Sequence, residues 1–198
     1  QNTITGSNNV AMGLNALDKV TSGYENVAIG RNALSYSETA ARNVAIGSSV
    51  LADAENSKEV TGSDNVAMGA NALDGVTSGS YNVGIGRDAG RNISSGTNNV
   101  TIGRSIMYNG DPDRDVMIGS NNVAIGSDIM DRASSANYNI GIGARALQNL
   151  TTGDRNVAIG ASVMSLGRTS GYNNVAIGTN ALDRDTIGTN NVAIGTNA

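Results

Sequence analysis

The chain has 198 residues and a formal net charge of −4, and it contains 26 Gly and six Tyr but neither Phe nor Trp. Cys and His are both absent, which excludes disulfide frameworks, thiolate and imidazole metal sites, and serine–histidine catalytic triads. The acidic balance argues against nucleic-acid partners, and no apolar run approaches the roughly 20 residues of a membrane-spanning helix. Because 39% of the residues are hydrophobic and 15% are charged, we expect a folded chain, but a thin and repetitive one without a broad core.

A five-residue motif, Asn-Val-Ala-Ile-Gly with small variations, recurs along the whole chain. Its glycine stands at Gly13, Gly30, Gly47, Gly69, Gly86, Gly103, Gly126, Gly143, Gly160, Gly178 and Gly195. Most of these glycines are 17 residues apart, and every third connection is stretched, to 22, 23 and then 18 residues. We therefore predict a single repeat domain over residues 1–198, with super-repeats at about 7–62, 63–119 and 120–171 and a partial one at 172–198. The similar string at residues 116–119 is interpreted as part of a long connection.

Each unit is typical of one coil of a solenoid, as the unit at residues 24–39 illustrates. Val27 and Ile29 alternate with Ala28, so the two larger residues face one way and the alanine the other. We expect this strand to end at the repeat glycine, and a second short strand to follow at residues 32–34. Stacking such units pairs each strand with its copies above and below. The sequence thus predicts an all-β fold, a parallel β-solenoid of about eleven coils.

The repeated positions are expected to hold the stack together. The Asn before each strand should form a ladder of side-chain amides. Between Val and Ile stands a small residue, Ala in eight copies, so either the interior of the coil or a neighbouring chain approaches closely on that side. A coil that buries about four apolar side chains is marginally stable alone, which leads us to expect an obligate oligomer. The predicted structural residues are represented by Asn26, Val27, Ile29, Gly30, Asn43, Val44, Ile46, Gly47, Asn156, Val157, Ile159 and Gly160.

The repeat also resembles that of a known group of proteins. The string Asn-Val-Ala-Ile-Gly-x-Asn-Ala-Leu is similar to the head repeats of YadA-like trimeric autotransporter adhesins. It resembles still more closely the tandem repeats of bacteriophage tail-fibre proteins, which share its spacing and its Thr-Thr-Gly or Thr-Ser-Gly link. The resemblance covers about Ile4 to Ala198 and implies a left-handed parallel β-roll, three chains per fibre and attachment to a cell surface. An adhesin head, a phage fibre shaft and another extracellular filament all stay open.

Three other groups of residues carry weaker signals. Asp111, Asp113 and Asp115 alternate around the only Pro, as in loops that bind calcium, although a solvated turn explains them better. Residues 141–146 match a dinucleotide-binding G-x-G-x-x-A string, but such a site needs a strand that leads into a helix, and here the string is one copy of the repeat. Three arginines directly follow the repeat glycine and are expected on an exposed edge, where solubility alone explains them: Arg31, Arg87 and Arg104.

These features predict a protein that is not an enzyme and has no cofactor. We expect an extracellular, cell-surface or virion-borne fibre segment, a rigid rod that presents binding loops to a cell-surface glycan or protein. The loops would be the stretched connections, at residues 52–64, 108–121 and 165–173. The expected partners are further copies of the chain, most simply in a homotrimer, with no nucleic acid and no membrane insertion. The alternative is a self-assembling filament of rods stacked end to end, because the first and last residues lie inside repeat units.

Overall fold

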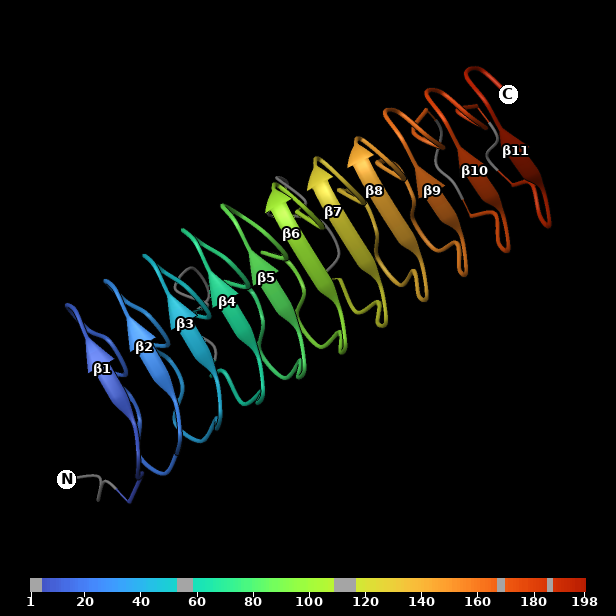
Figure 1. Ribbon diagram of the computed structural model, residues 1–198. Helices are drawn as coiled ribbons and strands as arrows, with labels where there is room; N and C mark the ends of the chain where they lie inside the picture. The colour runs from blue at the N-terminus through green and yellow to red at the C-terminus, as the bar shows by residue number, and fades with distance from the viewer. Residues whose placement is uncertain (1–4, 53–58, 109–116, 167–169, 185–186) are drawn as a thin grey trace.

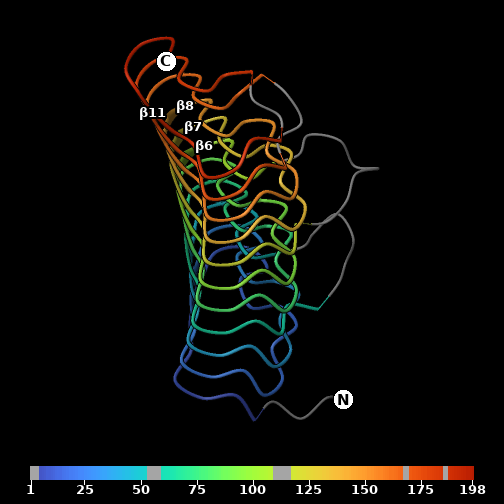
Figure 2. The same cartoon turned by 90° about the vertical axis from the view of Figure 1, so that its right-hand side faces the viewer.

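The computed structural model describes residues 5–52, 59–108, 117–166, 170–184 and 187–198, and these form an all-β protein. One parallel sheet contains eleven strands, each paired with the next strand in the chain (Figure 1). The strands wind into a β-solenoid of about ten turns, with the strands stacked along one side and the turns on the other (Figure 2). They are β1 (Val10–Met12), β2 (Val27–Ile29), β3 (Val44–Ile46), β4 (Val66–Met68), β5 (Val83–Ile85), β6 (Val100–Arg104), β7 (Val123–Ser127), β8 (Ile140–Ala144), β9 (Val157–Ile159), β10 (Val175–Ile177) and β11 (Val192–Ile194).

The strands pair without offset, so each residue lies beside its equivalent in the next coil. Val27 pairs with Val44 and Ile29 pairs with Ile46, and the same register continues across the stretched connection from β3 to β4. We call the repeat that contains strand βn coil n, and we call equivalent residues of successive coils a column. The predicted parallel solenoid is confirmed, and the extra residues of the stretched connections do not disturb the sheet.

The second short strand predicted at residues 32–34 is wrong, because this segment is a turn. Asn32 and Leu34 have φ angles of 56° and 51°, whereas an extended strand needs a strongly negative φ. Hydrogen bonds still join the coils there, and the Leu34 N–H donates to the Val50 carbonyl at 2.9 Å. A left-handed residue other than Gly costs roughly 1–2 kcal/mol, so these turns depend on the neighbouring coils that hold them.

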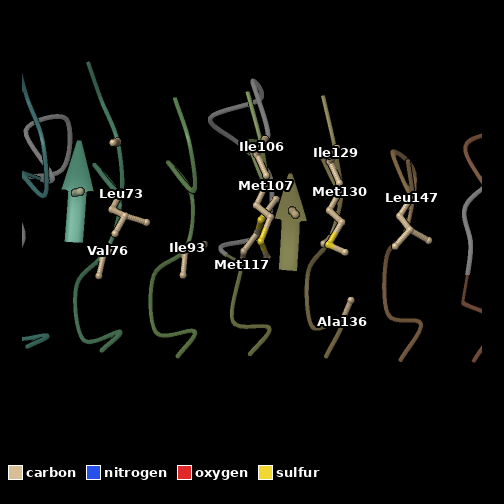
Figure 3. Packing of buried hydrophobic residues seen from close by; sticks show 14 of the residues in the cluster. Leu73, Val76, Ile93, Ile106, Met107, Met117, Ile129, Met130, Ala136 and Leu147 are labelled. Carbon is tan, nitrogen blue, oxygen red and sulfur yellow. The ribbon is translucent and has the colours of Figure 1, made fainter. Parts of the chain in front are cut away.

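The interior of each coil is a single thin layer of aliphatic side chains. The strand contributes its middle residue, and Ala28 and Ala45 are fully buried. The small column therefore faces the interior of its own coil, which answers the question that the sequence left open. The turn contributes a larger side chain, and these stack from coil to coil (Figure 3). The fully buried ones of this column are Leu34, Leu51, Leu73, Met107, Met130, Leu147 and Met164.

Side-chain volumes compensate between neighbouring coils. In coil 5 the middle residue of the strand is Gly84, and Gly90 stands where other coils have the buried Leu or Met of the turn. Coil 5 therefore contributes little side-chain volume at these two positions. Leu73 of coil 4 occupies the space, since a Cβ atom on Gly84 would lie 2.7 Å from Leu73 Cγ. In coil 6 the strand column holds a buried Thr101, whose hydroxyl donates to the Val83 carbonyl at 3.1 Å. The core is thus fitted coil by coil, although the repeat is regular.

Candidate functional site

A ladder of asparagine side chains runs along the rod, one residue before each strand. Asn43 Oδ1 accepts hydrogen bonds from the backbone N–H and from Nδ2 of Asn65, at 2.9 and 3.1 Å. Asn43 Nδ2 donates to Asn26 Oδ1 at 3.3 Å and to the Gly62 carbonyl at 3.0 Å. All four hydrogen-bonding positions of this buried amide are thus satisfied. The predicted ladder is confirmed, and Asn26, Asn43 and Asn156 are structural residues with no accessible surface.

The repeat glycines form a second structural column at the end of the strands. Gly30, Gly47 and Gly160 have φ angles of 130°, 136° and 133°, a region that side chains disfavour. A Cβ atom on Gly47 would also lie 2.9 Å from the Gly69 carbonyl oxygen. Two features therefore require glycine at this position: the positive φ angle and the close approach of the next coil.

The outward face of the sheet is a continuous apolar surface. Each of the eleven strands presents two aliphatic side chains on it, one Val or Ile and one Ile or Met. At about 4.8 Å per coil and about 3.3 Å per residue, this face measures roughly 48 by 13 Å, or about 600 Å². That area lies at the upper end of the largest apolar patches on monomeric proteins. The sequence-predicted Val27, Val44, Val157, Ile29, Ile46 and Ile159 all lie on it and are half-buried by their neighbours.

Two rows of residues border this apolar face. The starting rim is the residue before each ladder asparagine: Asn8, Glu25, Arg42, Asp64, Tyr81, Asn98, Asn121, Tyr138, Arg155, Asn173 and Asn190. The ending rim is the residue after each repeat glycine: Leu14, Arg31, Ser48, Ala70, Arg87, Arg104, Ser127, Ala144, Ala161, Thr179 and Thr196. The three arginines predicted on an exposed edge lie on the ending rim and are exposed.

On the starting rim, one arginine is fully engaged within the chain. Arg42 Nε and Nη2 donate to the two carboxylate oxygens of Asp64 at 2.6 and 2.7 Å. The guanidinium also lies over the ring of Tyr24, 5.6 Å from its centroid. The Arg42 guanidinium holds the pKa of the Asp64 carboxyl below its usual range. A bidentate pair of this kind is geometrically specific, but its exposure keeps its energy modest.

Other residues of the starting rim differ in whether they have an ionic or cation–π partner within the chain. Arg155 lies over the ring of Tyr138, 5.7 Å from its centroid. Tyr81 has the neutral Asn98 beside it in the next coil instead of an arginine. Within the described part of the chain, the Tyr81 ring has no cation above it and Glu25 forms no ion pair.

The turn side of the rod carries a separate cluster of charges. Arg91 Nε lies 3.5 Å from Asp74 Oδ2, and Arg91 Nη1 lies 3.6 Å from Asp88 Oδ1. The guanidinium also stacks on Tyr108 of the next coil, 5.4 Å from the ring centroid. Because a fixed guanidinium neutralises both carboxylates, the cluster links coils 4, 5 and 6 and is not arranged for acid–base catalysis.

Asp131 is a second notable group on the turn side. Burial raises the pKa of its carboxyl to about 6, against a smaller lowering by the hydrogen bond from Gln148. Gln148 Nε2 donates to Asp131 Oδ2 at 3.2 Å, and Oδ1 is buried without a hydrogen-bond partner. Neither Asp131 nor the Arg91 cluster was predicted from the sequence. Asp74 and Arg91 are one repeat of 17 residues apart, a spacing that signals stacked opposite charges.

Two sequence-predicted sites remain, the aspartate loop and the dinucleotide-binding string. Asp111, Asp113 and Asp115 lie outside the described residues. The string at residues 141–146 lies on β8 and the turn after it, with no helix. In the described ranges, no group of three or more acidic residues could hold a metal ion. The same ranges contain no helix long and apolar enough to cross a bilayer.

The stretched connections begin at equivalent positions on the turn side. Ala52, Tyr108 and Ser165 each stand five residues after a repeat glycine, in coils 3, 6 and 9. Because the coils stack in register, these three positions share one column, three coils apart. The turns that the chain makes between strands lie on the side of the rod away from the strands (Figure 2).

Comparison with protein-family models, with curated proteins and with solved structures gives no match. The resemblance to adhesin and tail-fibre repeats therefore depends on the repeat residues themselves.

Proposed function

We propose that the protein is a non-enzymatic structural and adhesive fibre segment, in which copies of the solenoid associate side by side through the outward apolar face. The observation that carries this proposal is that face, two uninterrupted aliphatic columns on all eleven strands. Covering about 600 Å² of apolar surface per chain gains on the order of 15 kcal/mol before the costs of association. A thin coil that leaves this surface in water would lose that gain.

The width of the face favours three copies. Packed sheets lie about 10 Å apart, so each sheet of a closed ring stands about 5 Å from the central axis. Three sheets at that distance enclose a triangle with sides of about 17 Å, and four enclose a square with sides of about 10 Å. The backbone from Asn26 to Gly30 spans about 13 Å and that from Glu25 to Arg31 about 20 Å. The triangle therefore suits the strand with its rims, and we propose a homotrimer of left-handed β-rolls.

This arrangement leaves the turn side free for attachment. The stretched connections begin at Ala52, Tyr108 and Ser165, five residues after a repeat glycine, and the turns lie on the side away from the sheet (Figure 2). Loops on a rigid scaffold are common sites of recognition. We therefore propose an extracellular location, on a cell surface or a virion, with a cell-surface glycan or protein as the ligand of these loops.

The first experiment measures the solution mass by light scattering across a dilution series, for the natural chain and two variants. A constant mass about three times the 20.1 kDa of one chain is expected. Ile85→Glu places a charge on the exposed apolar face of coil 5 and should give a folded monomer. Ser78→Glu adds the same charge on the exposed turn side of coil 4 and should leave the trimer intact.

A stable monomer of the natural chain would overturn the proposal. A mass that grows with concentration without limit would favour the end-to-end filament instead. For attachment, we replace residues 109–116 by a Gly/Ser linker of equal length and measure the binding of the labelled trimer to cells. Unchanged binding would remove that connection from the proposed adhesive surface.

A further inference from the structure

The two rims carry complementary groups at opposite ends of the same strand. In coil 2, Glu25 is exposed on the starting rim and forms no ion pair within the described part of the chain. On the ending rim of that coil, exposed Arg31 donates to Ser48 Oγ at 3.4 Å and forms no ion pair with any described residue. In coil 5, Tyr81 is 60% exposed with an uncovered ring, and the Arg87 side chain is 62% exposed although its Nε lies 3.4 Å from Asp88 Oδ2 of the same coil. Each of these coils thus presents an anion or an aromatic ring at one end and a cation at the other.

In the coils whose starting-rim residue has a charged or aromatic partner within the chain, the ending-rim residue is uncharged. Arg42 and Asp64 bind each other, and Arg155 covers Tyr138. Two of the three ending-rim arginines have an aspartate within the chain: Arg87 has Asp88 of its own coil at 3.4 Å, and Arg104 has Asp128 of the next coil at 3.3 Å. The ending-rim residues in the coils of Arg42, Asp64, Tyr138 and Arg155 are Ser48, Ala70, Ala144 and Ala161.

A closed ring of parallel rods brings these two rims together. The strands run across the rod (Figure 1), so in a ring about the rod axis the end of each strand meets the start of the next copy's strand. Such a contact is heterologous, and it closes only when all copies lie at the same height. Equivalent coils of neighbouring copies therefore contact each other. Within one chain, Glu25 and Arg31 are about 20 Å apart along the strand and cannot reach each other.

We propose that the rims set the orientation and the axial register of the assembly. Glu25 of one copy pairs with Arg31 of the next, and Arg87 of one copy stacks on the Tyr81 ring of its neighbour, as Arg42 stacks on Tyr24 within the chain. This inference rests on the proposed side-by-side association and adds that the copies are parallel and without offset. The apolar columns cannot supply this register, because a slip of one coil buries nearly the same side chains. Charged and aromatic rim pairs occur in particular coils only. A slip of one coil would separate these pairs and weaken the association.

The test is disulfide cross-linking of the full chain, which contains no Cys. In the double variant Glu25→Cys/Arg31→Cys, the two cysteines of one chain are too far apart to bridge, since a disulfide needs Cα atoms within about 7 Å. After oxidation with diamide, a non-reducing gel should show covalent species of up to three chains and none larger. The matched control, Glu25→Cys/Ser48→Cys, moves the ending-rim cysteine one coil along and should cross-link at least tenfold more slowly. Glu25→Cys alone should give no covalent dimer.

Faster cross-linking of the offset pair, or efficient dimers from Glu25→Cys alone, would overturn the inference. Absence of cross-links in a chain whose mass is that of a trimer would overturn it too, while leaving the proposed association in place. A monomeric mass for the natural chain would overturn both. A charge swap gives a second readout: Arg31→Glu should shift dissociation to a severalfold higher protein concentration, and Glu25→Arg/Arg31→Glu should restore it. Equal weakening in the single and the swapped variant would contradict the pairing.

Discussion

Replacing Asn43 by Ala tests the asparagine ladder in the interior of the rod. The change removes four side-chain hydrogen bonds, two to Asn65, one to Asn26 and one to the Gly62 carbonyl. The Asn65 backbone N–H and the Gly62 carbonyl then lose a partner while buried, at about 1–3 kcal/mol each. Asn65 Nδ2 keeps its bond to the Gly79 carbonyl at 3.0 Å, which limits the loss. We expect the free energy of unfolding to fall by about 3–5 kcal/mol.

The assay is urea unfolding followed by circular dichroism, with all variants at one protein concentration so that association contributes equally. Asn98→Gly is the matched control, because Asn98 is exposed with a φ of 57° and Gly adopts the same conformation. We expect this variant to stay within about 0.5 kcal/mol of the natural chain. A loss below about 1 kcal/mol for Asn43→Ala, or equal losses in the two variants, would refute the view that buried amide bonds stabilise the stack.

Two further predictions concern the turn side and the core. The pKa of Asp131 is raised from 3.8 to about 6, so the folded chain holds this proton more tightly than the unfolded chain does, and stability falls as pH rises between these values. Asp131→Asn should therefore add about 1–2 kcal/mol near pH 7.5, after allowance for solvent screening, and nothing near pH 3.5; an equal gain at both pH values in urea unfolding would contradict this. Gly84→Ala places a Cβ atom 2.7 Å from Leu73 Cγ and should cost about 1–3 kcal/mol. Gly84→Ala/Leu73→Val should recover part of that loss, whereas additive losses in the double variant would mean that the two residues do not interact.

The strands and their register were predictable from the sequence, because the alternation and the 17-residue spacing each specify one arrangement. The segment at residues 32–34 was not, since its apolar pair is typical of a strand and nothing in a leucine signals a left-handed φ. Hydrophobicity also could not decide which face of the sheet is inside. Val27 and Ile29 are the more hydrophobic residues, yet Ala28 is the buried one. A coil this thin has room for a small residue only, and its thickness appears only once the turn is built.

The candidate interaction surface was predictable in part. The three ending-rim arginines follow the repeat glycine and were expected on an edge, but their relation to the starting rim requires the register of the stack. Arg42 and Asp64 illustrate the difficulty, because they are 22 residues apart across a stretched connection and still adjacent in space. The raised pKa of Asp131 likewise depends on burial, which no local pattern reveals.

Pairing without offset has a consequence for how such a molecule changes length. Joining Asn26 directly to Val44 removes 17 residues and recreates the motif at the junction, and the two cut faces match because β2 and β3 present equivalent atoms. Where neighbouring coils carry the same interior residues, as coils 2 and 3 do with Ala in the strand and Leu in the turn, loss or duplication of a whole repeat shortens or lengthens the rod by about 4.8 Å without a new core. A change of any other size has to leave the stack as a protruding loop. Recombination between such matching repeats can thus change the length of the rod in equal steps while the product keeps the same fold.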